Sequence, residues 1–108
     1  MRSTTAFMLK IRGEHPMDIE LVLNSKPRIK ILKILAHVGQ LNTTQIAHRV
    51  SINYRTTFKH LKLLEDEGIL IRKKYGRIRL HRFNENSMKA NAVRKLLETW
   101  EDASICKH

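Results

Sequence analysis

Hydrophobic residues along this chain recur at helical spacing from residue 19 to residue 67, at strand spacing over the segment that follows, and at helical spacing again near the C-terminus. An apolar stripe over residues 19–23 predicts a short first helix that ends near Asn24. Ser25 can cap a second helix, and Gly39 ends it. The apolar stripe of the second helix is formed by Ile31, Leu32, Leu35 and Val38. The pattern therefore predicts two consecutive helices, the second of which faces the core.

Two more helices follow, with a short turn between them. Asn42 and Gln45 have the spacing of a capping box, which opens a brief helix. Asn53 caps a longer helix over residues 54–67, and Gly68 marks its end. The apolar face of the longer helix is formed by Thr57, Leu61 and Leu64. A brief helix, a two-residue turn and a longer helix are typical of a helix-turn-helix, in which the second helix enters the major groove.

After Gly68 the hydrophobic period changes from helical to alternating, which predicts a β-hairpin. We place its turn around Tyr75 and Gly76, because glycine can adopt the positive φ of a tight connection. On the return strand, Arg77, Arg79 and His81 alternate against Ile78, Leu80 and Phe83. The alternation predicts a cationic face on the hairpin and an apolar face behind it.

The two ends of the chain carry weaker signals. Residues 1–15 show no sustained period, and we expect an arm with a frayed terminus, although the alternation of Phe7, Leu9 and Ile11 leaves a short strand open. A last helix opens at Asn86 or Ser87. Its apolar stripe is formed by Val93, Leu96, Leu97 and Trp100.

Positive charge is concentrated in the middle of the chain. Residues 25–83 contain 14 Lys or Arg and three acids, whereas both flanks are neutral, so the formal net charge of +11 belongs to this middle segment. Nucleic acid, an anionic membrane surface and an acidic protein are the candidate partners of such a segment. The cations are spread over two helices and a hairpin and do not follow one face of an amphipathic helix, which favours nucleic acid over a membrane.

Size and composition exclude several other classes of protein. The 108 residues, 42% of them hydrophobic and 29% charged, are enough for one folded domain. No apolar run is long enough to span a bilayer, and residues 6–9 are too short for the core of a signal peptide, so we expect a cytoplasmic, nucleoid-associated protein. A single cysteine, Cys106, cannot form an internal disulfide. No Gly-rich phosphate loop, Gly-x-Ser-x-Gly or His-Glu-x-x-His motif occurs, so we expect no enzyme and no cofactor.

Three segments resemble the ArsR-type winged-helix family, particularly its small archaeal members. They are Ser-Lys-Pro-Arg-Ile-Lys-Ile-Leu over residues 25–32, Thr-Gln-Ile-Ala over residues 44–47, and residues 53–70. The most specific part is the run His-Leu-Lys-x-Leu-Glu-x-x-Gly-Ile-Leu over residues 60–70, and the match as a whole covers roughly residues 17–100. The resemblance implies a mainly α fold with a β-hairpin wing, a winged helix-turn-helix that dimerises through its first and last helices.

The resemblance also implies sites on this chain. DNA contacts are implied for Thr43, Thr44, Gln45, Tyr54, Arg55, Thr56, Lys59, Lys73, Lys74, Arg77 and Arg79. Lys62, near or on the outer face of the same helix, and Tyr75, at the hairpin tip, are further candidates for DNA contact. A dimer interface is implied for Ile19, Val22, Val93, Leu96, Leu97 and Trp100. Alternatives stay open: the cations can be a solvated face, Tyr54 can pack on a neighbouring loop, Tyr75 can be an exposed turn residue, and the last helix can pack on its own domain. The implied domains are an N-terminal arm over 1–15, a winged helix-turn-helix over 16–84, and a dimerisation helix with its tail over 85–108.

Metal sensing, which many ArsR-type regulators perform, is disfavoured by the ligand pattern. The family uses paired cysteines near the recognition helix, or histidines with carboxylates on the last helix. Here Cys106 has no second cysteine, and the last helix has no histidine before His108. His37, His48, His60 and His81 lie at unrelated spacings on separate elements. For His60 we expect a structural contact with the wing or the backbone.

These observations predict a sequence-specific regulator of transcription that binds duplex DNA, most simply a repressor that acts as a homodimer. The principal alternative is an abundant architectural chromatin protein of low specificity with the same fold. A protein-interaction module and an RNA-binding protein are further alternatives. The RNA alternative is the weaker one, because sheet-based RNA binding uses several aromatic residues, and the hairpin offers Tyr75 and Phe83 alone.

Overall fold

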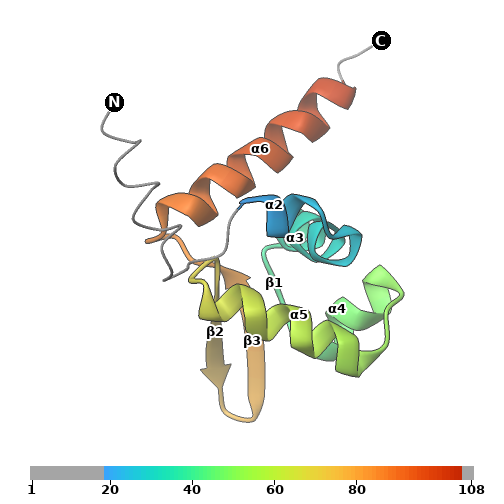
Figure 1. Cartoon of the computed structure of the whole chain (residues 1–108). Helices are drawn as coiled ribbons and strands as arrows, with labels where there is room; N and C mark the ends of the chain where they lie inside the picture. The colour runs from blue at the N-terminus through green and yellow to red at the C-terminus, as the bar shows by residue number, and fades with distance from the viewer. Residues whose placement is uncertain (1–18, 106–108) are drawn as a thin grey trace, which may run out of the picture.

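A computed structural model describes residues 19–105, which contain five helices and three strands (Figure 1). In chain order these elements are α2 (Ile19–Leu23), α3 (Lys26–Val38), β1 (Gln40–Leu41), α4 (Thr43–Val50), α5 (Tyr54–Asp66), β2 (Leu70–Tyr75), β3 (Ile78–Phe83) and α6 (Met88–Ile105). The arm expected over residues 1–15 and the lone Cys106 lie outside the described residues. The mainly α class with a β-hairpin wing is confirmed.

The predicted helix caps are all present. The Ser25 hydroxyl accepts the backbone N–H of the third residue after it, and Gly39 ends α3 at a φ of 106°. Asn42 and Gln45 form a reciprocal capping box, in which the side chain of each accepts the backbone N–H of the other at 2.8 and 2.9 Å. The Asn53 side chain caps α5 by a single bond, in which it accepts the backbone N–H of Thr56 at 2.8 Å. These local bonds satisfy N–H groups that a helix start leaves unpaired, which is why the sequence could place the boundaries.

The three strands form one antiparallel sheet in the order β1-β3-β2. Leu70 pairs with Phe83 at the base of the hairpin, and Tyr75 pairs with Ile78 at its tip. The third strand, β1, was not predicted. It contains two residues, too few for any hydrophobic period, and its pairing with β3 alone defines it.

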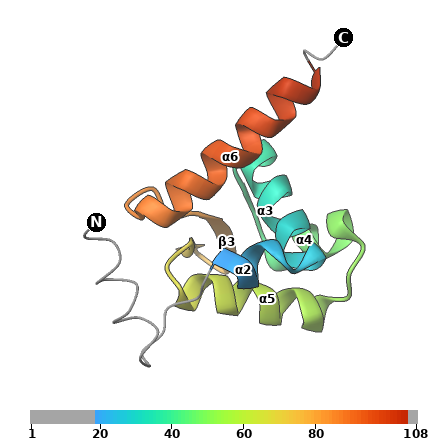
Figure 2. The same cartoon turned by 45° about the horizontal axis from the view of Figure 1, so that its top comes forward.

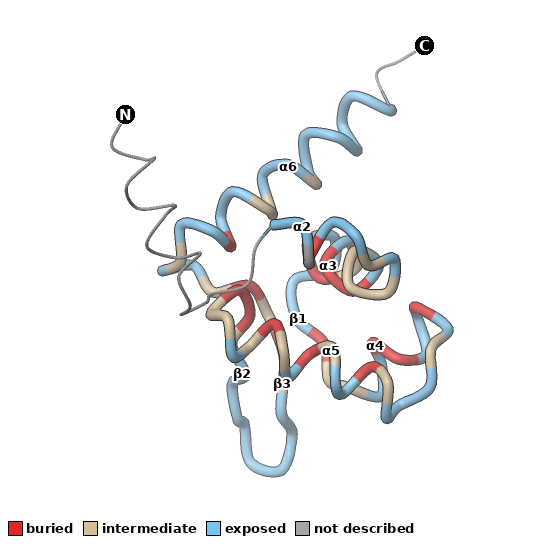
Figure 3. Tube along the Cα trace, viewed as in Figure 1, coloured by how far each residue is buried: buried red, intermediate tan, exposed pale blue. Residues whose placement is uncertain are grey.

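The predicted alternation along β3 is wrong in two places. His81 was placed with the arginines, but it is 2% exposed, whereas Ile78 was placed on the apolar face and is 53% exposed. The base of the hairpin packs against α3, α4 and α5, and the tip projects beyond these helices (Figure 3). A strand face is buried only where another element covers it, so one strand can bury a polar residue at its base and expose an apolar residue at its tip.

The core lies where the helices converge on the base of the sheet. Its fully buried side chains include Ile31, Leu32, Leu35, Ile46, Leu61, Leu64 and Leu70. Helix α6 packs across α3, and its C-terminal turns extend beyond the core (Figure 2). The core therefore holds α4, α5 and the hairpin in a fixed arrangement.

The apolar residues of the terminal helices divide into two groups. Val22 is buried in the core, and Val93 and Leu97 pack partly against it, so these three have little free surface. Ile19, Leu96 and Trp100 are exposed by 61%, 45% and 69%. The single stripe expected on α6 is therefore two faces, one that joins the helix to its own domain and one that points outward.

Candidate nucleic-acid interface

Helices α4 and α5 form the two helices of the helix-turn-helix. Ser51 adopts the left-handed conformation, with a φ of 59°, and the backbone N–H of Ile52 donates to the carbonyl of Ala47 at 3.1 Å. The turn is tight for this reason. The buried stripe of Thr57, Leu61 and Leu64 then fixes the rotation of α5, so the opposite face of α5 points outward.

That outer face is cationic. Arg55, Lys59 and Lys62 are exposed, and Thr56 is half-buried beside them. Within residues 19–105, neither Arg55 nor Lys59 has an ion-pair partner. Lys62 lies 3.5 Å from Asp66, with both side chains more than half exposed, so this pair contributes little to stability. The acids of α5 are confined to its last turn, away from the end that begins at Tyr54.

An aromatic pair lies beside these cations, and sequence reasoning found only one of its members. The rings of Tyr54 and Phe58 are stacked, with 6.3 Å between centroids and 7° between planes. Their exposed fractions are 55% and 40%. Phe58 was missed, although a signal was available. It follows Tyr54 by four residues and falls outside the buried stripe of Thr57, Leu61 and Leu64.

The wing carries a second group of cations. Lys73, Lys74, Tyr75, Arg77 and Arg79, all predicted to contact DNA, are exposed, and so is Arg72, which was not predicted. Lys74 lies directly opposite Arg79 across the two strands, an arrangement that is unfavourable for like charges. The strands from residue 70 to residue 83 contain no acid that would neutralise them. A polyanion bound to the wing would relieve this repulsion.

The two helices and the wing meet at one hollow. Its volume is about 300 Å³, and it is lined by Asn42, Thr43, Thr44, Tyr54, Phe58, Arg72, Arg77, Ile78, Arg79 and His81. Three arginines and no acid line it, and the first turn of α4 lies at its edge. Free backbone N–H groups at a helix start, together with arginines, are the groups that bind phosphate.

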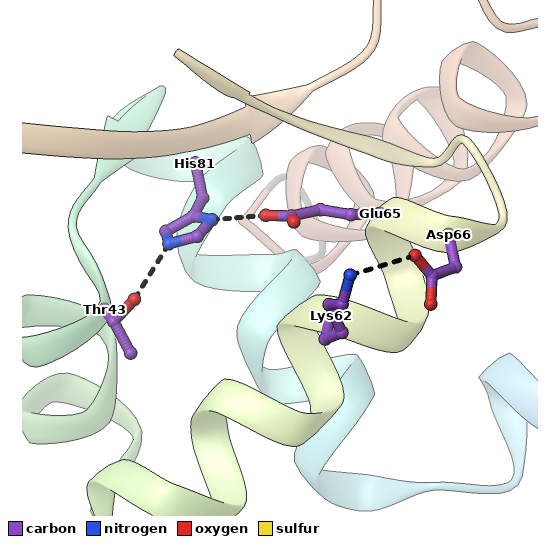
Figure 4. A network of polar contacts seen from close by, with 5 residues as sticks. All are labelled: Thr43, Lys62, Glu65, Asp66 and His81. Atoms are coloured by element: carbon purple, nitrogen blue, oxygen red, sulfur yellow. Dashed lines mark hydrogen bonds and ion pairs between the residues drawn. The ribbon is translucent and has the colours of Figure 1, made fainter. Parts of the chain in front are cut away.

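A buried hydrogen-bond network joins the three elements (Figure 4). His81 on β3 lies 2.7 Å from Glu65 on α5, between Nδ1 and Oε2, and 2.8 Å from Thr43 on α4, between Nε2 and Oγ1. Because a carboxylate only accepts hydrogen bonds, the imidazole donates from Nδ1, and in the neutral ring Nε2 accepts from the Thr43 hydroxyl. One side chain thus fixes the wing against both helices.

Two solved structures have a similar fold. The transcriptional repressor PagR of Bacillus anthracis is 26% identical, with a TM-score of 0.61 over 70% of this chain and 84% of PagR. The homodimeric winged helix-turn-helix DNA-binding domain of Mb0332 from Mycobacterium bovis, described as a possible ArsR-family regulator, is 21% identical. Its TM-score is 0.63 over 83% of this chain and 81% of the domain.

Comparison with known sequences identifies the family of this chain. A family model described as winged helix-turn-helix DNA-binding matches residues 25–71. The chain is 30% identical to the HTH-type transcriptional regulator B-115 of Sulfolobus spindle-shape virus 1 over 77 residues. These residues cover 71% of this chain and 67% of the relative. The chain is a winged helix-turn-helix transcriptional regulator. The predicted family and DNA-binding function are confirmed, and the family is one of regulators and not of enzymes.

Within this regulator, two of the predicted contacts on α4 already have partners. The Thr43 hydroxyl is engaged by His81, and the Gln45 side chain is engaged in the capping box. The backbone N–H of Gln45 is engaged as well, by the Asn42 side chain at 2.8 Å, so of these two residues only Thr43 offers its backbone N–H to a ligand. Thr44 is exposed.

His60 makes a structural contact, as expected, but its hydrogen-bond partner is a side chain of α3, whereas we expected the wing or the backbone. The Arg28 side chain donates from Nε to His60 Nδ1 at 3.2 Å. Partial burial, and then the charge of Arg28, lower the pKa of His60 below its usual value. The histidine of the regulator's most specific motif therefore fixes α5 to α3.

The described part of the regulator was also searched for a metal site and for a membrane span. Over residues 19–105, no group of three or more His, Cys, Asp or Glu side chains is arranged to hold a metal ion. No helix in this range is both long and apolar enough to cross a bilayer.

Proposed function

We propose that this chain forms a homodimer that binds a specific duplex DNA site and represses transcription by occluding a promoter. The observation that carries the proposal is the acid-free hollow where α4, α5 and the wing meet, with three arginines around it. Its walls belong to the elements that a winged helix-turn-helix presents to a double helix.

The side chains divide by the part of DNA that they would contact. Arg55, Thr56 and Tyr54, at the start of α5, are the candidates for base edges in the major groove. Lys59 and Lys62 lie further along the same helix and are candidates for contact with the same DNA. The first turn of α4, through the backbone N–H groups of Thr43 and Thr44, is suited to one phosphate, and the capping box of Asn42 and Gln45 holds this turn in place. Lys73, Lys74, Tyr75, Arg77 and Arg79, together with the newly found Arg72, are suited to the adjacent backbone or minor groove.

The outward face of the terminal helices supports the homodimer. Trp100 is 69% exposed and Leu96 45% exposed on α6, and Ile19 is 61% exposed on α2. Large apolar side chains that gather on an exposed face are typical of a partner site. A twofold pairing through this face would place the two recognition helices about one duplex turn, about 34 Å, apart and would select a pseudo-palindromic site.

Selection from random duplex DNA, followed by affinity measurement at two salt concentrations, tests the proposal. We expect an enriched pseudo-palindrome whose affinity exceeds that of random sequence by more than about 10³-fold. A ratio near one would favour the architectural alternative. Lys74→Ala should weaken binding to every sequence, and Lys95→Ala, an exposed lysine on α6, serves as its charge-matched control.

A further inference from the structure

The stacked pair of Tyr54 and Phe58 is an apolar patch inside a cationic surface. No other ring contact is present among the described residues, and both side chains keep about half of their surface exposed. Arg55, Lys59 and Lys62 lie on the outer side of the patch, and the wing arginines lie across the hollow from it. The fold leaves these two rings exposed to water, so a ligand that covers them would gain the free energy of burying their apolar surface.

The surroundings of the patch decide what kind of ligand can cover it. An apolar protein surface would have to bury the flanking cations without partners, which is costly. Duplex DNA offers phosphates to those cations at the same time. Within the major groove, the prominent apolar group on a base edge is the C5-methyl group of thymine. Phe58 has no hydrogen-bonding atom, so any polar group of a base that packed against its ring would lose its water without gaining a partner.

We propose that Phe58, with Tyr54 stacked on it, reads thymine methyl groups in each half-site. This inference rests on the proposed function and adds the base that one part of the recognition helix selects. Four residues of helix advance about 6 Å along the axis, and successive bases are about 3.4 Å apart along a strand. The two rings therefore cover one or two adjacent base pairs, next to the pair that faces Arg55.

Replacing single thymines by deoxyuridine in the selected duplex tests the assignment, because this change deletes the methyl group and keeps base pairing. Burial of one methyl group corresponds to about a fourfold change in Kd. We expect the wild-type chain to bind about fourfold more weakly when uracil replaces thymine at one or two adjacent positions of each half-site. At the other thymines we expect no change. A 5-methylcytosine at the sensitive position should bind more tightly than cytosine there.

Two variants assign the effect to the ring. Phe58→Ala should reduce the ratio of uracil to thymine Kd values from about four to about one at the sensitive positions. Lys59→Ala, one residue along the helix, should weaken binding to both duplexes and leave the ratio at about four. Phe58 is 40% exposed and lies outside the core, so the alanine variant should fold, and its thermal unfolding verifies this.

The outcomes separate this proposal from the one on which it rests. If no sequence is enriched over random DNA, the regulator function and the thymine assignment both fail. If a site is enriched and Arg55→Ala relaxes its sequence, but every uracil substitution is neutral, the thymine assignment alone is overturned. A fourfold ratio that persists in Phe58→Ala also overturns it, because another residue then contacts the methyl group.

Discussion

His81 on the wing and Glu65 on the recognition helix are in direct contact, with 2.7 Å between Nδ1 and Oε2. The imidazole is 2% exposed and the carboxylate side chain 14% exposed, so the contact is shielded from solvent. Thr43 completes the network from the third element. A polar contact that is shielded from solvent therefore holds the wing against the recognition helix.

Replacing His81 with leucine should destabilise the protein and weaken DNA binding. Leucine fills much of the volume but leaves the Glu65 carboxylate and the Thr43 hydroxyl without their partner. The loss of such buried partners costs about 1–3 kcal/mol. Urea unfolding measures the stability, and titration of the selected duplex measures the affinity. Arg82→Leu, a half-buried neighbour on the same strand, is the control. Equal unfolding midpoints for His81→Leu and wild type would contradict the structural role of the network.

His60 should make the stability of the fold depend on pH. Partial burial and the nearby Arg28 hold its pKa below the usual 6.5, so near that pH the unfolded chain binds more protons than the folded one. The stability is then fully present above pH 6.5 and decreases as the pH falls toward the lower pKa of the folded state.

The variant His60→Gln isolates this effect. Glutamine cannot be protonated and can still accept from Arg28, so thermal unfolding between pH 7.5 and 5.5 should show a smaller loss of Tm in the variant than in the wild type. His48→Gln, which removes an exposed histidine from α4, is the control. An unchanged pH dependence in His60→Gln would show that another group is responsible.

The elements that the sequence could place are those fixed by local bonds. Ser25, Asn42 and Asn53 cap their helices, and residues of these types directly before an apolar helical stripe can be recognised in the sequence. The features that were missed depend on contacts between distant segments. Strand β1 exists only through its pairing with β3, and the burial of His81 depends on two helices from elsewhere in the chain.

The sequence predicted most of the residues of the candidate site, but it predicted less well how these residues are arranged in space. The resemblance to the ArsR-type family, together with the distribution of charge, identified most of the cations on α5 and the wing. Phe58 was missed, although its position four residues after Tyr54 and outside the buried stripe of α5 indicated a ring that the core does not cover. The pairing of His60 with Arg28 joins residues 32 positions apart, which no local pattern could indicate.

Arg55 and Lys74 should contribute to DNA binding in different ways. Arg55→Ala should reduce discrimination at one base pair of each half-site by about 1–3 kcal/mol, because a base contact depends on sequence. Lys74→Ala should lower the affinity for all sequences and reduce the slope of log K against log salt by about one, because a phosphate contact releases a counterion. Competition titrations against single-base variants at several salt concentrations measure both quantities. An Arg55→Ala variant that loses affinity equally for every duplex would remove Arg55 from base reading.

Leu96 should determine whether the chain is a dimer. It is 45% exposed on the outer face of α6, close along the helix to Trp100, which is 69% exposed, so a second copy that covers this face would bury both. A charge at this position would be costly to bury in an interface but harmless in water. Leu96→Asp should therefore sediment as a monomer under conditions in which the wild type is a dimer, and Lys95→Asp, on the neighbouring exposed position, controls for added negative charge on α6. The monomer should also bind a single half-site with about the same affinity as a full site, because linkage between the two recognition helices is lost. A Leu96→Asp variant that remains dimeric would place the interface on another surface of the molecule.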